Sequence, residues 1–171
     1  GPHAGPMPHW PAELGVSPMT PYRYFADKED ILAAVRANGF NRFAEVMERA
    51  RDSAKSARAK GAAVGEAYIR FALEHPHTYK LMFDLNQPDE GNYPELVEAG
   101  RRARATMSGY VKDQVAEGLI EGDPDQVGRM FWAATHGAIV LELAGKLPAG
   151  AVRELAHAMP QARGRGLKPG A

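Results

Sequence analysis

The residues best suited to chemistry in this sequence form a short polar run near its start. Tyr22, Arg23 and Tyr24 are consecutive, and their polar tips can bind phosphates and the edges of bases. Lys28 follows at the expected start of a helix, where its backbone amide and its ammonium group together can hold a phosphate. This combination of residue types predicts contacts with DNA.

A turn and a short helix are predicted to position this polar run. Gly15 can take the left-handed conformation that closes a preceding helix, whose visible end is residues 12–14. Ser17 or Thr20 can then cap a new short helix, and Pro21 suits the first position of a helix that starts after Thr20. A helix, a glycine-containing turn and a second helix form the helix-turn-helix, whose second helix enters the major groove.

Two stretches of the sequence resemble the TetR family of transcriptional regulators. The segments GVS (residues 15–17), TPYRYF (20–25) and DKE (27–29) resemble the end of the DNA-binding domain of that family. The segments FWAATHG (131–137) and LELAG (141–145) look like the Trp/His/Gly-containing helix of one class of TetR C-terminal domain. The resemblance implies an all-helical homodimer that binds a small ligand in its C-terminal domain and pairs through its last two long helices.

The resemblance also implies which residues contact operator DNA. Ser17, one of the two candidate caps of the short helix, belongs to this predicted set. The positions that match phosphate contacts are Thr20, Tyr22, Tyr24 and Lys28, and those that match positions near base edges are Pro18, Met19 and Arg23. The alternative is that Tyr22 and Phe25 mainly pack the small domain, and this alternative is favoured for Phe25.

The sequence departs from the family at its start. The family places one complete helix and most of a second ahead of the turn, whereas the residues before Ala12 are rich in Pro, Gly and His. Without that cover, Val16, Tyr22 and Phe25 would each lose about 1.5–3 kcal/mol of burial free energy. The sequence therefore predicts weak or absent binding of operator DNA. The leading hypothesis is a ligand-responsive repressor that binds operator DNA as a homodimer, and the alternative is a dimeric small-molecule-binding protein of the same lineage that no longer binds operator DNA.

Helical periodicity extends over nearly all of the remaining chain. The predicted fold class is therefore all-α, with a truncated helix-turn-helix unit followed by an α-helical ligand-binding and dimerisation bundle. The predicted helices run from Lys28 to before Gly61, over 62–74, 78–85, 94–117 and 124–146, and from beyond Pro148 to Met159. The predicted divisions are a disordered leader or expression remnant (1–11), a partial DNA-binding domain with its connecting helix (12–50), the ligand-binding and dimerisation domain (51–159) and a disordered tail (160–171).

Aromatic and methionine side chains in the later helices are candidates for a ligand pocket. Such side chains can line the apolar cavity that is typical of a small-molecule site, although at least half of them are expected to form simple core. For His136 the alternatives are a pocket residue and a core histidine bonded to a backbone carbonyl. The candidate pocket residues are Tyr79, Met82, Phe83, Met107, Tyr110, Trp132 and His136.

The helix predicted over residues 124–146 carries two adjacent apolar stripes. One stripe can cover the core of the monomer, and the other needs a separate cover, which favours a subunit interface. The stripes are Val127, Phe131, Ala134, Ala138 and Leu141, and Trp132, His136, Ile139 and Leu143.

Composition and missing motifs exclude other classes of protein. Lys and Arg (21) balance Asp and Glu (21) over the 171 residues, so DNA contacts must come from a local patch. The absence of cysteine removes thiolate zinc sites and cysteine nucleophiles, and it fits a cytoplasmic protein. No apolar run reaches the ~18 residues of a membrane span. We expect no enzyme activity, cofactor or metal, because the sequence has no glycine-rich phosphate loop, nucleophile elbow or HExxH motif.

Overall fold

The secondary structure of the described part of the chain is entirely helical, which confirms the predicted all-α class. The computed structural model describes residues 27–166, with side chains described for residues 27–159. The elements are α3 (Lys28–Ser53), α4 (Ala57–Glu74), α5 (Pro76–Met82), the 3-10 helix η1 (Glu90–Asn92), α6 (Pro94–Ala116), α7 (Pro124–Leu143) and α8 (Ala151–Gly166). The predicted helix-turn-helix over residues 12–26 lies outside the described residues.

Aspartate caps begin two of the long helices, at the helix starts predicted at Lys28 and residue 124. The Asp27 carboxylate accepts a hydrogen bond from the Asp30 amide at 3.0 Å at the start of α3. The Asp123 carboxylate accepts one from the Gln126 amide at 2.9 Å at the start of α7. Each cap satisfies an amide that has no partner within its own helix.

The start predicted for α4 near residue 62 is wrong, because the helix begins at Ala57. The Ser56 hydroxyl caps it by accepting a hydrogen bond from the Ala59 amide at 3.1 Å. Gly61 lies inside α4 and does not break it. A Cβ on Gly61 would stand 2.3 Å from Nε2 of Gln114, so this glycine allows α6 to approach closely.

Three other helix ends differ from the sequence-based boundaries. α5 ends at Met82, short of the end predicted at residue 85, and Leu85 lies outside the helix and is 97% exposed. α7 ends at Leu143 and is followed by Gly145 with φ of 69°, the left-handed conformation that glycine adopts without strain. α8 continues to Gly166, past the end predicted at Met159, so residues 160–166 of the predicted tail are helical.

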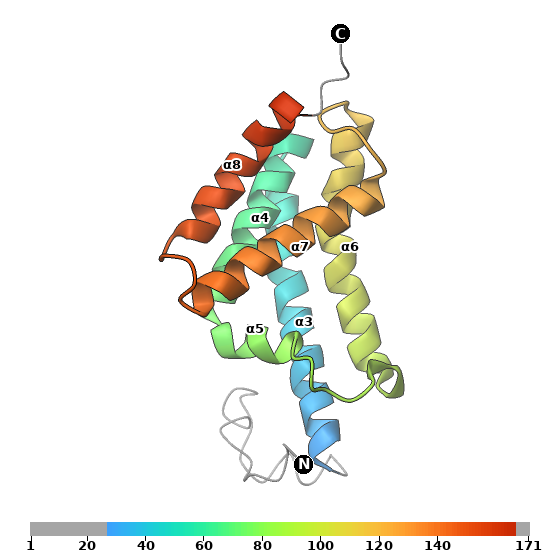
Figure 1. Ribbon diagram of the computed structural model, residues 1–171. Helices are drawn as coiled ribbons and strands as arrows, with labels where there is room; N and C mark the ends of the chain where they lie inside the picture. Colours follow the sequence, from blue (N-terminus) through green and yellow to red (C-terminus); the bar gives the residue numbers. More distant parts are fainter. Residues whose placement is uncertain (1–26, 167–171) are drawn as a thin grey trace.

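The helices form a bundle in which α3 is central. α3 packs along α6 and α4, α7 crosses over α4 and α6, and α8 lies beside α4 and α7 (Figure 1). Phe43 of α3 is fully buried and meets the Tyr68 ring edge-on, with ring centroids 4.7 Å apart. The helical periodicity predicted from Lys28 is confirmed in α3, where Ile31, Leu32, Val35, Phe43 and Met47 are buried and Val46 is half-buried.

Arg36 is a buried charge that the apolar pattern of α3 does not predict. Its side chain is 5% exposed and donates hydrogen bonds to the carbonyl oxygens of Leu81 (3.2 Å) and Met82 (3.1 Å), at the end of α5. It also forms an ion pair with Glu90 of η1 at 2.6 Å. A buried cation is tolerated only with such partners, so Arg36 fixes α5 and η1 against α3.

Polar contacts also hold α6 and α8 in place. Arg102 of α6 forms a two-pronged ion pair with Glu48 of α3, at 2.8 and 2.6 Å. Arg153 of α8 pairs with Glu66 of α4 at 3.1 Å. The Glu142 carboxylate accepts a hydrogen bond from the Val152 amide at 3.2 Å, which ties the end of α7 to the start of α8. None of the described helices has an apolar stretch long enough to cross a membrane.

Candidate functional site

A buried hydrogen-bond chain joins three helices at the centre of the bundle. Tyr68 of α4 and Tyr79 of α5 bring their hydroxyl oxygens to 2.8 Å. The Tyr79 hydroxyl oxygen also lies 2.6 Å from Nδ1 of His136 on α7. His136 is therefore bonded to a hydroxyl, and not to the backbone carbonyl that one of the two predicted alternatives assumes.

Burial disfavours the charged forms of all three groups in this hydrogen-bond network. It raises the pKa of Tyr68 to about 12 and raises the pKa of Tyr79 well above its usual range. Burial also lowers the pKa of His136 below 6.5. A neutral imidazole can accept a hydrogen bond at Nδ1, which suits donation from the Tyr79 hydroxyl.

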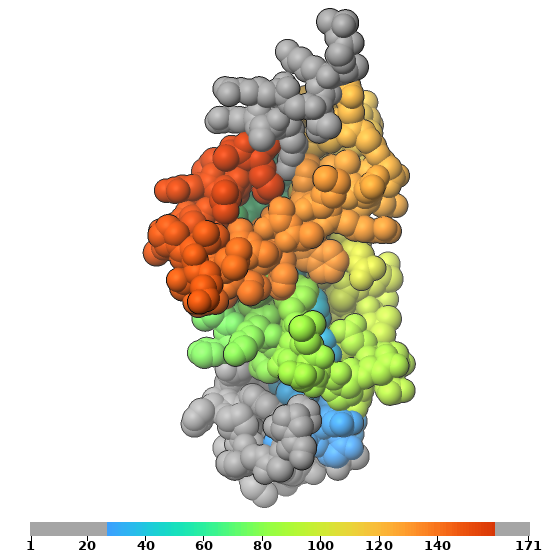
Figure 2. Space-filling view, viewed as in Figure 1, coloured from blue at the N-terminus to red at the C-terminus, as the bar shows by residue number. Residues whose placement is uncertain are grey.

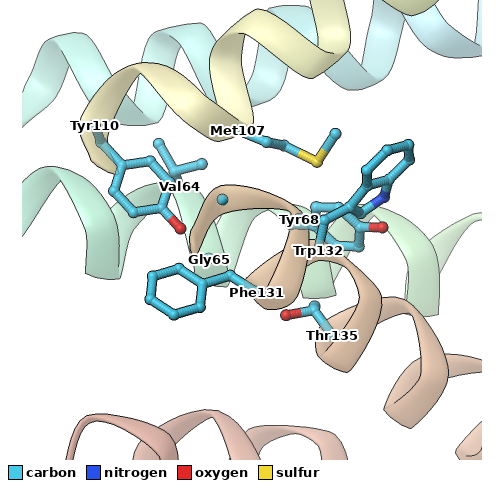
Figure 3. Close-up of a pocket in the computed structure, with 9 residues that line it drawn as sticks. Val64, Gly65, Tyr68, Met107, Tyr110, Phe131, Trp132 and Thr135 are labelled. Carbon is cyan, nitrogen blue, oxygen red and sulfur yellow. The ribbon is translucent and has the colours of Figure 1, made fainter. Parts of the chain in front are cut away.

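A cavity of about 30 Å³ lies between α4, α6 and α7, beside the hydrogen-bonded side chains, and Tyr68 lines it (Figure 3). Its volume is enough for about one water molecule. The Trp132 indole nitrogen at its wall is buried and has no hydrogen bond of normal geometry within the described residues. The lining residues are Val64, Gly65, Tyr68, Met107, Tyr110, Gly128, Phe131, Trp132 and Thr135.

The structure brings only some of the predicted pocket residues to this cavity. Met107, Tyr110 and Trp132 line it. Tyr79 and Met82 are fully buried in the core, and Phe83 and His136 pack beside them, with their ring centroids 4.7 Å apart.

Sequence reasoning does not assign four of the larger lining side chains to the pocket. Val64 and Tyr68 share one face of α4, and their spacing of four residues identifies them as core. Phe131 belongs to an apolar stripe of α7, and Thr135 lies one turn after it. The helical period places these residues on a common face, but it gives no sign that a cavity lies opposite.

A positively charged side chain, Arg104, lies against the Trp132 ring. The Arg104 guanidinium lies over the Trp132 ring, 5.7 Å from its centroid, which is within the range of a cation–π contact. The Phe83 ring lies 6.2 Å from the Trp132 ring, centroid to centroid. Trp132 is thus held between α6 and the end of α5.

A larger open groove of about 570 Å³ lies between α3 and α4, away from the hydrogen-bond chain. Val46, Ala50, Ala67 and Phe71 contribute apolar surface to it. Charged side chains also line it, among them Arg70 and Glu66, which form an ion pair at 3.8 Å. The sequence analysis does not predict this groove.

Lys28 is the described member of the predicted DNA-binding set. It is the first residue of α3 and is half-buried. The first turn of α3 begins at Lys28, as the sequence predicts, directly after the Asp27 cap. The remaining members, Ser17, Pro18, Met19, Thr20, Tyr22, Arg23 and Tyr24, lie outside the described residues.

Both apolar stripes predicted for α7 contribute side chains to the core. Ile139 is fully buried, and Trp132 and Ala138 pack against the core. Met130 is 63% exposed, and α7 and α8 lie together on the side of the molecule seen in Figure 2. We define the α7–α8 face as the exposed large apolar side chains of these helices, Met130, Val140, Leu141, Leu143 and Leu155.

Comparisons with known proteins agree with this fold. Residues 62–162 match the family described as "Tetracyclin repressor-like, C-terminal domain". A solved protein of unknown function from Rhodococcus sp. RHA1 is 32% identical, with a TM-score of 0.75, over 93% of this chain and 82% of that chain. The TetR family transcriptional regulator PfmR from Thermus thermophilus shares the fold at 21% identity, with a TM-score of 0.64, over 93% of this chain and 87% of that chain. No curated protein sequence matches. The chain belongs to the TetR, or tetracyclin repressor-like, family.

Proposed function

We propose that this chain is a transcriptional repressor that binds operator DNA as a homodimer and releases it when a small apolar molecule binds. The observation that carries the proposal is the family match across residues 62–162, which contain the cavity and the α7–α8 face. PfmR, named as a transcriptional regulator, shares the fold over 93% of this chain, which supports the same role.

The polar run before α3 supports the DNA-binding part of the proposal. Lys28 starts a helix of 26 residues whose later turns are buried in the bundle. Any displacement of α3 within the bundle would therefore reach the residues that precede Lys28. In a dimer, two such ends would present recognition helices to successive major-groove faces, about 34–36 Å apart.

The contacts of α5 support the part of the proposal in which a ligand changes the position of α3 and so controls DNA binding. Tyr79 of α5 is bonded to His136 of α7, and the last carbonyls of α5 are bonded to Arg36 of α3. A ligand that displaces α7 must strain one of these contacts, or move α5 and α3 with it. The ligand shifts DNA binding only by its difference in affinity for the two arrangements.

Selection of random duplex DNA on the purified chain at physiological salt tests the proposal, because affinity for DNA depends steeply on salt. We expect enrichment of a palindrome. The double variant Tyr24→Ala/Lys28→Ala removes two predicted phosphate contacts and should lose most of the affinity for it. The matched control Lys55→Ala removes an exposed charge between α3 and α4 and should retain that affinity.

A folded, dimeric chain that enriches no DNA would contradict the proposal. It would favour the other hypothesis, a dimeric small-molecule-binding protein without operator binding.

A further inference from the structure

We propose that the cavity between α4, α6 and α7 accepts an uncharged, flat aromatic molecule. This inference rests on the function proposed above, because it names the chemical class of the ligand that would control DNA binding. It can be tested without DNA.

The lining of the cavity sets this ligand class. Four aromatic rings and a methionine surround it, and rings and thioethers favour contact with another ring. Its described lining includes no Lys, Arg, Asp, Glu or His. A charged ligand would lose its hydration there without gaining an ion pair, which is costly. The ring and sulfur groups belong to Tyr68, Met107, Tyr110, Phe131 and Trp132 (Figure 3).

The cavity must widen to admit such a molecule. Its volume of about 30 Å³ suits a water molecule, whereas a cavity that binds benzene measures about 150 Å³. Phe131 lines the cavity and is only half-buried, so a movement of its ring would open the cavity on the solvent side. Gly65 provides space on α4, because a Cβ placed there would meet no atom within 4 Å.

An aromatic acid is the competing ligand class, because its carboxylate could pair with the Arg104 guanidinium. This guanidinium lies over the Trp132 ring, but Arg104 does not line the cavity. A carboxylate could therefore reach Arg104 only from outside the aromatic lining. The uncharged class fits the residues that would surround the ligand itself.

Calorimetric titration of the full chain with quinoline and with quinoline-2-carboxylate separates the two classes. The two probes share one ring system, and quinoline is uncharged at mildly alkaline pH. We expect quinoline to bind and quinoline-2-carboxylate to bind at least about tenfold more weakly, a difference that calorimetry resolves.

The variant Gly65→Leu fills the cavity from α4 and should weaken quinoline binding at least about tenfold. Leucine is a better helix former than glycine, so the variant should fold, and thermal unfolding checks this. Gly100→Leu is the matched control, since Gly100 lies in α6, outside the cavity lining, and a Cβ there also meets open space. Its affinity should equal that of the unmodified chain.

Three results would overturn the inference. The first is absence of quinoline binding to the unmodified, folded chain, and the second is equal binding to the Gly65→Leu variant. The third is binding of quinoline-2-carboxylate as tight as that of quinoline, which would assign the site to aromatic acids. None of these results bears on DNA selection, so failure of the ligand class remains distinguishable from failure of the proposed function.

Discussion

Single side chains join helices that are distant in the sequence, and the chain from Tyr68 through Tyr79 to His136 is the main example. Residue type and surroundings predict Tyr79 and His136 as candidate pocket residues. Their hydrogen bond could not be predicted, because 57 residues separate them and a helical period relates only near neighbours. Buried Arg36 escapes prediction for a similar reason, since its partners lie on α5 and η1.

The Tyr79 hydroxyl has two hydrogen-bond partners, Tyr68 and His136. Loss of the Tyr79 hydroxyl should therefore cost more stability than loss of the Tyr68 hydroxyl. Tyr79→Phe removes both hydrogen bonds at once. We expect a loss of about 1–3 kcal/mol in the free energy of unfolding, measured with urea. Tyr68→Phe leaves the Tyr79–His136 bond in place and should cost less. Equal or reversed losses would contradict the described chain.

The same groups predict how stability depends on pH. Burial lowers the pKa of His136, so the unfolded chain takes up a proton more readily than the folded chain does. This contribution to stability is complete above about pH 6.5 and is lost as the pH falls towards the folded pKa. Urea unfolding at a series of pH values should show the loss, and His136→Asn, which does not titrate, should reduce it. An unchanged pH profile in that variant would contradict the assignment.

The raised pKa of Tyr68 predicts the opposite trend in alkali. Its unfolded pKa is about 10 and its folded pKa is about 12, so the stability it contributes is present below pH 10. That stability is lost as the pH rises from about 10 to about 12. Tyr68→Phe should weaken the alkaline decline in urea unfolding experiments, and a decline of the same size in the variant would rule out this origin.

At the scale of helices, the spacing of apolar residues and the capping residues predict which segments are helical. Contacts between helices determine where several of these helices begin or end. Asp27 and Asp123 predict the starts of α3 and α7 because a cap bonds to its own helix. Gly61 misleads the prediction for α4, since a glycine that admits a neighbouring helix cannot be told from a helix break by sequence alone.

Two glycines of α4 test this explanation. Gly65→Ala should raise the free energy of unfolding by about 0.5–1 kcal/mol, because alanine favours the helix and its Cβ meets open space. Gly61→Ala gains the same helix preference, but its Cβ displaces the Gln114 amide, whose hydrogen bond to the Ala57 carbonyl is 3.1 Å long. We expect Gly61→Ala to be less stable than Gly65→Ala by about 1–2 kcal/mol in urea unfolding. Equal free energies of unfolding for the two variants would contradict this explanation, because they would show that α6 and Gln114 can move away from the added Cβ without loss of stability.

At the scale of the whole molecule, we propose that a second copy covers the α7–α8 face in the homodimer. The sequence predicts that one of two stripes on α7 needs a separate cover, and the structure leaves Leu141 of one stripe exposed while Ile139 of the other is buried. The stripes predicted from the period do not separate cleanly, because Leu143 belongs to the inward stripe but is exposed. Leu143 is the last residue of α7, where the chain leaves the helix and turns into α8, so the helical period no longer predicts its surroundings.

Charge placed on this face should separate the subunits. A buried, unpaired carboxylate is costly, so Leu141→Glu should convert the dimer to a monomer in sedimentation experiments. Leu119→Glu is the matched control, because Leu119 is similarly exposed but lies between α6 and α7, outside the α7–α8 face. A dimer that survives Leu141→Glu would place the interface elsewhere.

The proposed regulator is tested most directly by the composition of its complex with DNA. Sedimentation of the purified chain with its selected duplex, at physiological salt, measures how many chains bind each duplex. The account predicts two chains per palindromic duplex and a large loss of affinity in the Leu141→Glu variant, because each half-site binds one recognition helix. A complex with one chain per duplex, or full affinity in a monomeric variant, would contradict it.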